Sequence, residues 1–97
     1  MTIPDYVHDH FARHPGRVRP HLVCADGYRI SVQASAGHYC VPRDNAGPYL
    51  SVETYCARRP DGSPWRIPGI RMGGNPAAFV PVPLINRIIH RHGGLSE

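Results

Sequence analysis

Apolar side chains recur at helical spacing near both ends of the chain. Three of them, four positions apart, predict a helix over residues 2–14 with one apolar stripe, formed by Ile3, Val7 and Phe11. A second helix is predicted over residues 83–92, because Pro suits a first helical turn and two glycines follow as a stop. Its buried face is expected to hold Leu84, Ile85, Ile88 and Ile89, with Asn86, Arg87 and Arg91 outward.

The first half of the chain alternates apolar and polar residues, as strands do. Segments 22–25 and 28–34 flank Asp26-Gly27, a pair that favours a two-residue hairpin turn because its central positions need positive φ. On the second segment the residues expected to face inward are Tyr28, Ile30, Val32 and Ala34, and those expected to face outward are Arg29, Ser31 and Gln33.

A third strand is predicted over residues 49–56, and both of its faces carry apolar area. Its inward face is expected to hold Leu50, Val52, Thr54 and Cys56, and its outward face Tyr49, Ser51, Glu53 and Tyr55. Residues 78–82 form a short strand candidate that Pro81 confines to an edge of the sheet.

These elements predict a single α+β domain over residues 1–97. It consists of a small antiparallel sheet of three to four strands with an N-terminal and a C-terminal helix. Residues 35–48 lack periodicity and are expected to form a long loop. Residues 57–76 are rich in Pro and Gly, and within them Trp65 and Ile67 are expected to pack back on the domain.

The charge favours an acidic partner. All eleven basic side chains are Arg, the net charge is +4, and seven His can add to it in mild acid. Such a surface suits nucleic acid or an acidic patch on another protein, and argues against a protein that imitates DNA with an acidic face. No segment resembles a signal peptide or a membrane span, so we expect a cytoplasmic protein that does not bind membranes. The oligomeric state stays open.

Cysteine and histidine offer one possible metal site. Cys24, Cys40 and Cys56 with His38 have the donor chemistry of tetrahedral zinc, but the short Cys-x2–4-Cys clip of structural zinc sites is missing. Free Cys at inward strand positions behaves as a small apolar residue, and this interpretation is favoured. The sequence holds no paired carboxylates and no nucleophile with an orienting acid, so we expect no enzyme activity, metal or cofactor. A metal-dependent Cys/His enzyme remains the least favoured alternative.

The loop over residues 35–48 carries the mixture of side chains most typical of a working surface. Aromatic, guanidinium and amide groups together can anchor a protein partner or stack on bases and bind phosphate. The same composition also occurs in a simple turn cluster. Glu53 is expected to pair with Arg29 or Arg43. The predicted partner-binding residues are His38, Tyr39, Arg43, Asp44, Asn45 and Tyr49, with Arg29 and Glu53 beside them.

Several segments give the chain a family likeness. They are residues 24–35 (CADGYRISVQAS), 38–40 (HYC), 42–43 (PR), 47–49 (GPY), 80–83 (VPVP) and 92–94 (HGG), and they delimit two stretches, 24–49 and 80–94, that together make up a little under half of the chain. In these segments the chain resembles small phage and prophage proteins of the kind that includes anti-CRISPR proteins. The resemblance implies a phage-encoded inhibitor that binds a Cas protein or Cas–crRNA complex in the host cytoplasm, more in keeping with type I than type II. Such an inhibitor would block target DNA binding or cleavage. A small basic module that binds nucleic acid through its Arg side chains is the alternative.

Overall fold

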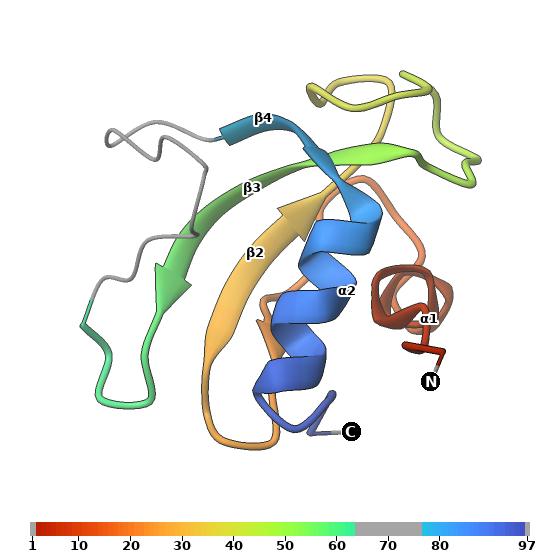
Figure 1. The fold of residues 1–97 in the computed structure, drawn as a ribbon. Coiled ribbons are helices and arrows are strands. Elements are labelled where there is room, and N and C mark those ends of the chain that lie inside the picture. Colours follow the sequence, from red (N-terminus) through yellow and green to blue (C-terminus); the bar gives the residue numbers. More distant parts are fainter. Residues whose placement is uncertain (1, 64–76, 97) are drawn as a thin grey trace.

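The computed structural model describes residues 2–63 and 77–96, apart from the side chain of Cys56. The expectations for Trp65, Ile67 and the Cys56 thiol lie outside the described residues. The elements are α1 (Tyr6–Arg13), β1 (Leu22–Val23), β2 (Arg29–Gln33), β3 (Ser51–Arg58), β4 (Ala77–Pro81) and α2 (Val82–Arg91). The strands form one antiparallel sheet in the order β1-β2-β3-β4 (Figure 1), which confirms the predicted α+β class.

Helix α1 begins later than its apolar stripe predicted. The N-cap residue is Asp5, three positions after the predicted start, and its carboxylate accepts the backbone N–H of His8 at 3.3 Å. A carboxylate suits this position because the first turn has unpaired N–H groups. His10 is buried on this helix and its Nε2 lies 3.0 Å from the Pro20 carbonyl, so the ring is held inside the protein by a backbone hydrogen bond.

The hairpin forms at the predicted place, but its turn holds three residues, 25–27, and not the predicted two, because the N–H of Cys24 donates to the Tyr28 carbonyl at 2.7 Å. Of the pair Asp26-Gly27, only Gly27 has the positive φ that was predicted for both. Gly27 has φ +93°, which only Gly adopts without strain, and the Asp26 carboxylate accepts the N–H of Tyr28 at 2.9 Å. Directly after the two residues of β1, Cys24 pairs with Leu95 near the C-terminus, and the N–H of Ser96 donates to the Val23 carbonyl at 3.0 Å. The last residues of the described chain therefore cover the outer edge of β1.

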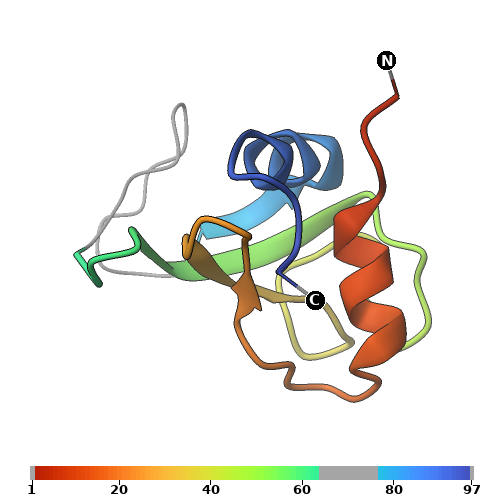
Figure 2. The same cartoon turned by 90° about the horizontal axis from the view of Figure 1, so that it is seen from below.

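The core lies between α2 and the sheet, and α1 stands beside α2 (Figure 2). The buried apolar residues include Val7 and Phe11 of α1, Leu22, Ile30, Val32, Val52 and Val80 of the strands, and Ile85, Ile88 and Ile89 of α2. In the part of the chain that the structure describes, neither helix has the length and hydropathy to cross a bilayer.

Asn86 does not face outward as predicted. It is buried between the helices, where its Oδ1 accepts the N–H of Val7 at 3.0 Å and its Nδ2 donates to Asp5 at 3.2 Å. The helical period placed Asn86 beside outward Arg87, but the crossing of α1 over this edge of α2 covers it. A side chain of α2 thus pairs one of the free N–H groups in the first turn of α1.

Ser31 and Gln33 are also buried, against the prediction that they face solvent or a partner. The segment between α1 and β1 crosses this face of β2. Gln33 Oε1 accepts the N–H of Arg19 at 2.9 Å and Gln33 Nε2 donates to the Arg19 carbonyl at 2.8 Å. The amide pairs both backbone groups of one residue and so holds the segment on the sheet, and β2 is buried on both faces.

The start of β3 also differs from the alternation that the sequence predicted. Leu50 is 73% exposed and Tyr49 is buried, the reverse of their expected positions. The strand begins at Ser51, so residues 49 and 50 belong to the preceding loop and follow its course rather than the sheet's period.

Candidate partner-binding surface

The loop before β3 is held in shape by its own polar side chains. The Asp44 carboxylate accepts the N–H groups of Gly47 and Ala46 at 2.8 and 3.0 Å, and these two bonds lower the pKa of Asp44. Asn45 Oδ1 accepts the N–H of Ala36 at 3.0 Å across the loop. Asp44 and Asn45, both predicted to contact a partner, thus use acceptor oxygens to stabilise turns.

Tyr49 anchors the end of this loop to α1. Its ring is stacked on His8 with an interplanar angle of 1° and meets Phe11 edge-on at 5.8 Å between centroids. Its N–H donates to His8 Nε2 at 2.8 Å, and its hydroxyl donates to the Asp44 carbonyl at 2.8 Å. Burial raises the pKa of the Tyr49 hydroxyl, and the charge of nearby Arg19 opposes this shift. Tyr49 is therefore a buried anchor that holds the end of the loop on α1.

His38 and Glu53 support the loop from beneath. His38 Nδ1 lies 2.6 Å from the Ser35 hydroxyl. The largely buried Glu53 carboxylate accepts the backbone N–H of Tyr39 at 3.2 Å, and among the described residues it bonds there rather than to Arg29 or Arg43. His38 is thus held to Ser35, and Glu53 holds the backbone of Tyr39. With the backbone held at these two points, the Tyr39 side chain leaves the loop in a defined direction.

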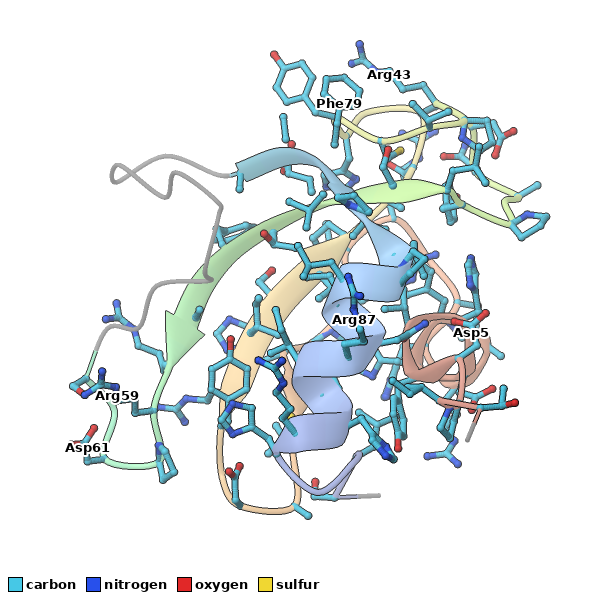
Figure 3. The ribbon with its side chains drawn as sticks, in the orientation of Figure 1. Asp5, Arg43, Arg59, Asp61, Phe79 and Arg87 are labelled. Atoms are coloured by element: carbon cyan, nitrogen blue, oxygen red, sulfur yellow. The ribbon has the colours of Figure 1, made fainter. Side chains whose placement is uncertain are left out.

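Tyr39, Arg43 and Phe79 form an exposed cluster, here called the aromatic patch. The rings of Tyr39 and Phe79 are 53% and 49% exposed and their centroids lie 6.1 Å apart. The Arg43 guanidinium carbon lies 5.2 Å from the centre of the Tyr39 ring, within cation–π range. Figure 3 shows Arg43 and Phe79 at the same end of the molecule, one from the loop and one from β4.

A bulge in β4 turns Phe79 outward. Val52 faces Val80 and Thr54 faces Ala77, so β4 holds one residue more than β3 over this stretch. Phe79 has φ +55°, a region that bulky residues rarely adopt, and its N–H donates to the Tyr39 carbonyl at 3.1 Å. Phe79 was not among the predicted partner-binding residues. Its one signal was an aromatic ring in a strand of small residues confined to an edge.

The backbone beside the patch continues the sheet. Val41 pairs with Ser51, and the Val41 carbonyl accepts the N–H of Leu50 at 2.7 Å. The exposed side chains of Val41 and Leu50 add apolar area on this side of the loop. The backbone next to the aromatic patch is therefore hydrogen-bonded to the start of β3, which holds this part of the loop in place.

Arg29 lies away from the patch. It pairs with Val23 and Arg58 at the hairpin end of β2, whereas Gln33, at the other end of that strand, pairs with Glu53. Of the eight residues predicted to bind a partner, the structure brings Tyr39 and Arg43 together at the surface. It places His38, Asp44, Asn45, Tyr49 and Glu53 as their supports, and it separates Arg29 from them.

The thiols have the surroundings of core residues. Cys24 and Cys40 are buried and free, and Cys40 Sγ lies 3.3 Å from the carbonyls of Ser35 and Pro42. Burial, with a smaller contribution from the charge of Asp26, raises the pKa of Cys24 to about 12, which disfavours the thiolate that metal binding and nucleophilic attack require. Over residues 2–63 and 77–96, no three His, Cys, Asp or Glu side chains converge as metal ligands.

Comparison with known proteins gives this chain no relative, since no protein-family model, curated sequence or solved structure matches it.

Proposed function

We propose that this chain is a protein-binding module whose contact surface is the aromatic patch. The observation that carries the proposal is the pair of half-exposed rings, Tyr39 and Phe79, beside the Arg43 guanidinium. Protein interfaces favour Tyr, Phe and Arg. Tyr and Phe bury a large area with only two rotatable side-chain bonds, and Arg presents a planar fork of hydrogen-bond donors.

Backbone strain at Phe79 supports a functional role for its exposure. A positive φ at a bulky residue costs on the order of 1–3 kcal/mol, and here it is spent on holding an apolar ring in solvent. Burying that ring within the sheet would favour folding, so its outward position is better explained by a partner. The Glu53 and Phe79 hydrogen bonds to the backbone of Tyr39 orient the second ring before any partner binds.

The partner is expected to present a carboxylate. The chain carries a net charge of +4, and Arg43 is exposed beside the two rings. A guanidinium stacked on a ring by its face keeps its N–H edge free for a bidentate carboxylate. A standard interface of roughly 800 Å² per partner would extend well past the patch.

The phage-protein resemblance of the sequence indicates which partners to test first. We infer an anti-CRISPR role in which the module docks on a Cas protein or Cas–crRNA complex, most simply of type I, and blocks target DNA binding or cleavage. This role requires no catalytic group and no cofactor from the chain. It places the protein in the cytoplasm of the host bacterium.

The test is binding to purified type I and type II surveillance complexes by biolayer interferometry, with inhibition of target cleavage as the second readout. Phe79→Ala and Tyr39→Ala are each expected to weaken binding by about 30-fold, the effect of losing a hot-spot side chain of about 2 kcal/mol. Arg43→Gln should weaken it and reduce its salt dependence. Matched controls are Val18→Ala and Arg91→Gln, which change an exposed Val and an exposed Arg on other elements.

Two results would overturn these proposals separately. Wild-type affinity in all three patch variants would show that the aromatic patch is not the contact surface. Failure to bind any complex or to restore phage growth on an immune host would remove the anti-CRISPR role. The alternative function is that of a nucleic-acid-binding module, in which Tyr39 stacks on bases and Arg43 pairs with phosphate. It predicts affinity for single-stranded nucleic acid that falls steeply with salt and is lost in the same variants.

A further inference from the structure

A hollow of about 530 Å³ lies between α1 and the loop before β3. Phe11, Pro48 and Tyr49 are among its apolar lining residues, and Arg19 and Asn45 are among its polar ones. Its volume is within the range of small-molecule sites, and its combination of aromatic walls with a few polar groups is typical of them. The hollow shares no residue with the aromatic patch, so its role is separate from the proposed function.

Arg19 is the unusual residue of this hollow. It is 8% exposed, and within the described residues no carboxylate pairs with its guanidinium. Nη1 donates to the Ala34 carbonyl at 2.7 Å, and the guanidinium carbon lies 3.9 Å from the centre of the Phe11 ring. The buried Nε has no hydrogen-bond partner among the described residues. A buried cation without a counter-ion is unfavourable, and an anion beside it would relieve that cost.

The Arg19 side chain is fixed in place before any ligand arrives. Gln33 bonds both the N–H and the carbonyl of Arg19, and the ring of Phe11 covers one face of the guanidinium. A guanidinium has five N–H donors in a rigid fork, and one of them is used by Ala34. A site with a pre-positioned donor group binds its anion with less loss of entropy.

Asn45 can supply a second donor. Its Oδ1 accepts the N–H of Ala36, so the Nδ2 amide is the group left to face a ligand. The carboxylate of Asp5, on the α1 side of the hollow, is already bonded to the N–H and ring of His8 and to Asn86. His8 Nε2 accepts the N–H of Tyr49, so the ring proton lies on Nδ1, toward Asp5.

We propose that this hollow binds a small organic oxyanion, a carboxylate or phosphate group carried on a flat apolar body. The oxyanion meets the Arg19 guanidinium and the Asn45 amide, and the flat body lies against Pro48 and Tyr49. Carboxylate and phosphate share the geometry that a guanidinium fork recognises, and the experiment distinguishes them.

The probes are benzoate, its neutral isostere benzamide, phenyl phosphate and inorganic phosphate, each at the same ionic strength. Binding is followed by the NMR signal of the Arg19 Nε–H and by the amide signals of residues 45–49. We expect benzoate or phenyl phosphate to bind with Kd of about 1 mM or tighter and to shift the Nε–H signal, and benzamide to bind at least about tenfold more weakly. A higher affinity for benzoate than for phenyl phosphate indicates that the natural ligand carries a carboxylate. A higher affinity for phenyl phosphate indicates that it carries a phosphate. The ratio of the affinities for phenyl phosphate and inorganic phosphate measures how much the contact with Pro48 and Tyr49 contributes to binding, and we expect phenyl phosphate to bind more tightly.

Asn45→Asp is the sharpest variant. It keeps an acceptor for the Ala36 N–H but replaces the amide donor with a negative charge, so the fold is kept and benzoate affinity should fall by about tenfold or more. Arg91→Gln, a charge change at an exposed residue of α2 outside the hollow, should leave benzoate affinity unchanged. No shift of the Nε–H signal with any probe would overturn the proposal. Equal binding of benzoate and benzamide, or wild-type affinity in Asn45→Asp, would also overturn it.

Discussion

Asn86 offers the most direct test of how the two helices are joined. Its Oδ1 accepts the N–H of Val7, the second residue of α1, and its Nδ2 donates to the capping carboxylate of Asp5. An N–H in the first turn of a helix has no partner within that helix, so Asn86 caps α1 from a neighbouring element. We predict that Asn86→Ala destabilises the protein far more than its position beside exposed Arg87 suggests.

The magnitude follows from the two lost bonds. Val7 is fully buried, so its unpaired N–H costs about 1–3 kcal/mol. The weaker bond to exposed Asp5 adds about 0.5 kcal/mol, which gives a loss of about 1.5–3.5 kcal/mol in the free energy of unfolding. For a domain of this size each kcal/mol lowers the melting temperature by about 5 °C, so it should fall by about 7–18 °C.

Asn86→Asp separates the two bonds. The carboxylate still accepts the N–H of Val7, but it stands where the amide now donates to Asp5, 3.2 Å away. Two carboxylates at that distance repel, which raises the pKa of the pair in the folded state above its unfolded value. This variant should therefore be least stable near pH 7 and should regain part of its loss as the pH falls toward about 4.

The assay is urea unfolding followed by circular dichroism, with Arg87→Ala as the matched control. The control changes an exposed residue on the same turn of α2 and should stay within about 0.5 kcal/mol of wild type. If Asn86→Ala falls in the same range, Asn86 does not cap α1. If Asn86→Asp shows no recovery in acid, the contact with Asp5 is not made in solution.

Two further predictions concern ionisable groups near the hairpin. The pKa of Asp26 is lowered by its hydrogen bond from the N–H of Tyr28 and, to a smaller extent, by its bond with the His92 ring. A carboxylate whose pKa is lower in the folded state than in the unfolded state stabilises the fold at a pH above its unfolded-state pKa. This stability is lost as the pH falls through the folded-state pKa. The urea concentration at the unfolding midpoint of the wild-type protein should therefore decrease as the pH is lowered below about 4, and that of Asp26→Asn should decrease less. The same pH dependence in both proteins would contradict this prediction. Burial raises the pKa of Cys24 to about 12, so iodoacetamide near neutral pH should label it only after unfolding, as mass spectrometry of the peptide would show. Labelling at the same rate in native and unfolded protein would refute that assignment.

Local patterns in the sequence were enough to predict the helices and strands and their order. Asp26-Gly27 specified the place of the hairpin because Gly27 adopts the positive φ that its turn needs, and the spacing of Ile85, Ile88 and Ile89 specified the buried face of α2. It also placed Tyr39 and Arg43 in an irregular loop. Each of these features depends on residues close together in the chain, where local geometry decides the outcome.

Contacts between distant residues decided the rest. Gln33 and Asn86 have outward positions in the periods of their own elements, and they are buried because residues far along the chain cross over them. Tyr49 and Leu50 exchanged their expected exposure because the loop continues to residue 50 and β3 begins at Ser51.

The candidate sites divide in the same way. The loop supplied Tyr39 and Arg43, but the aromatic patch exists because a bulge 40 residues later brings Phe79 against them. Arg19 was one basic residue among eleven in the sequence, and only the fold surrounds it with Phe11, Gln33 and Ala34. The period of a helix or strand predicts on which side of that element a side chain lies. Its burial and its neighbours depend on how the whole chain packs. The proposed binding sites depend on this packing.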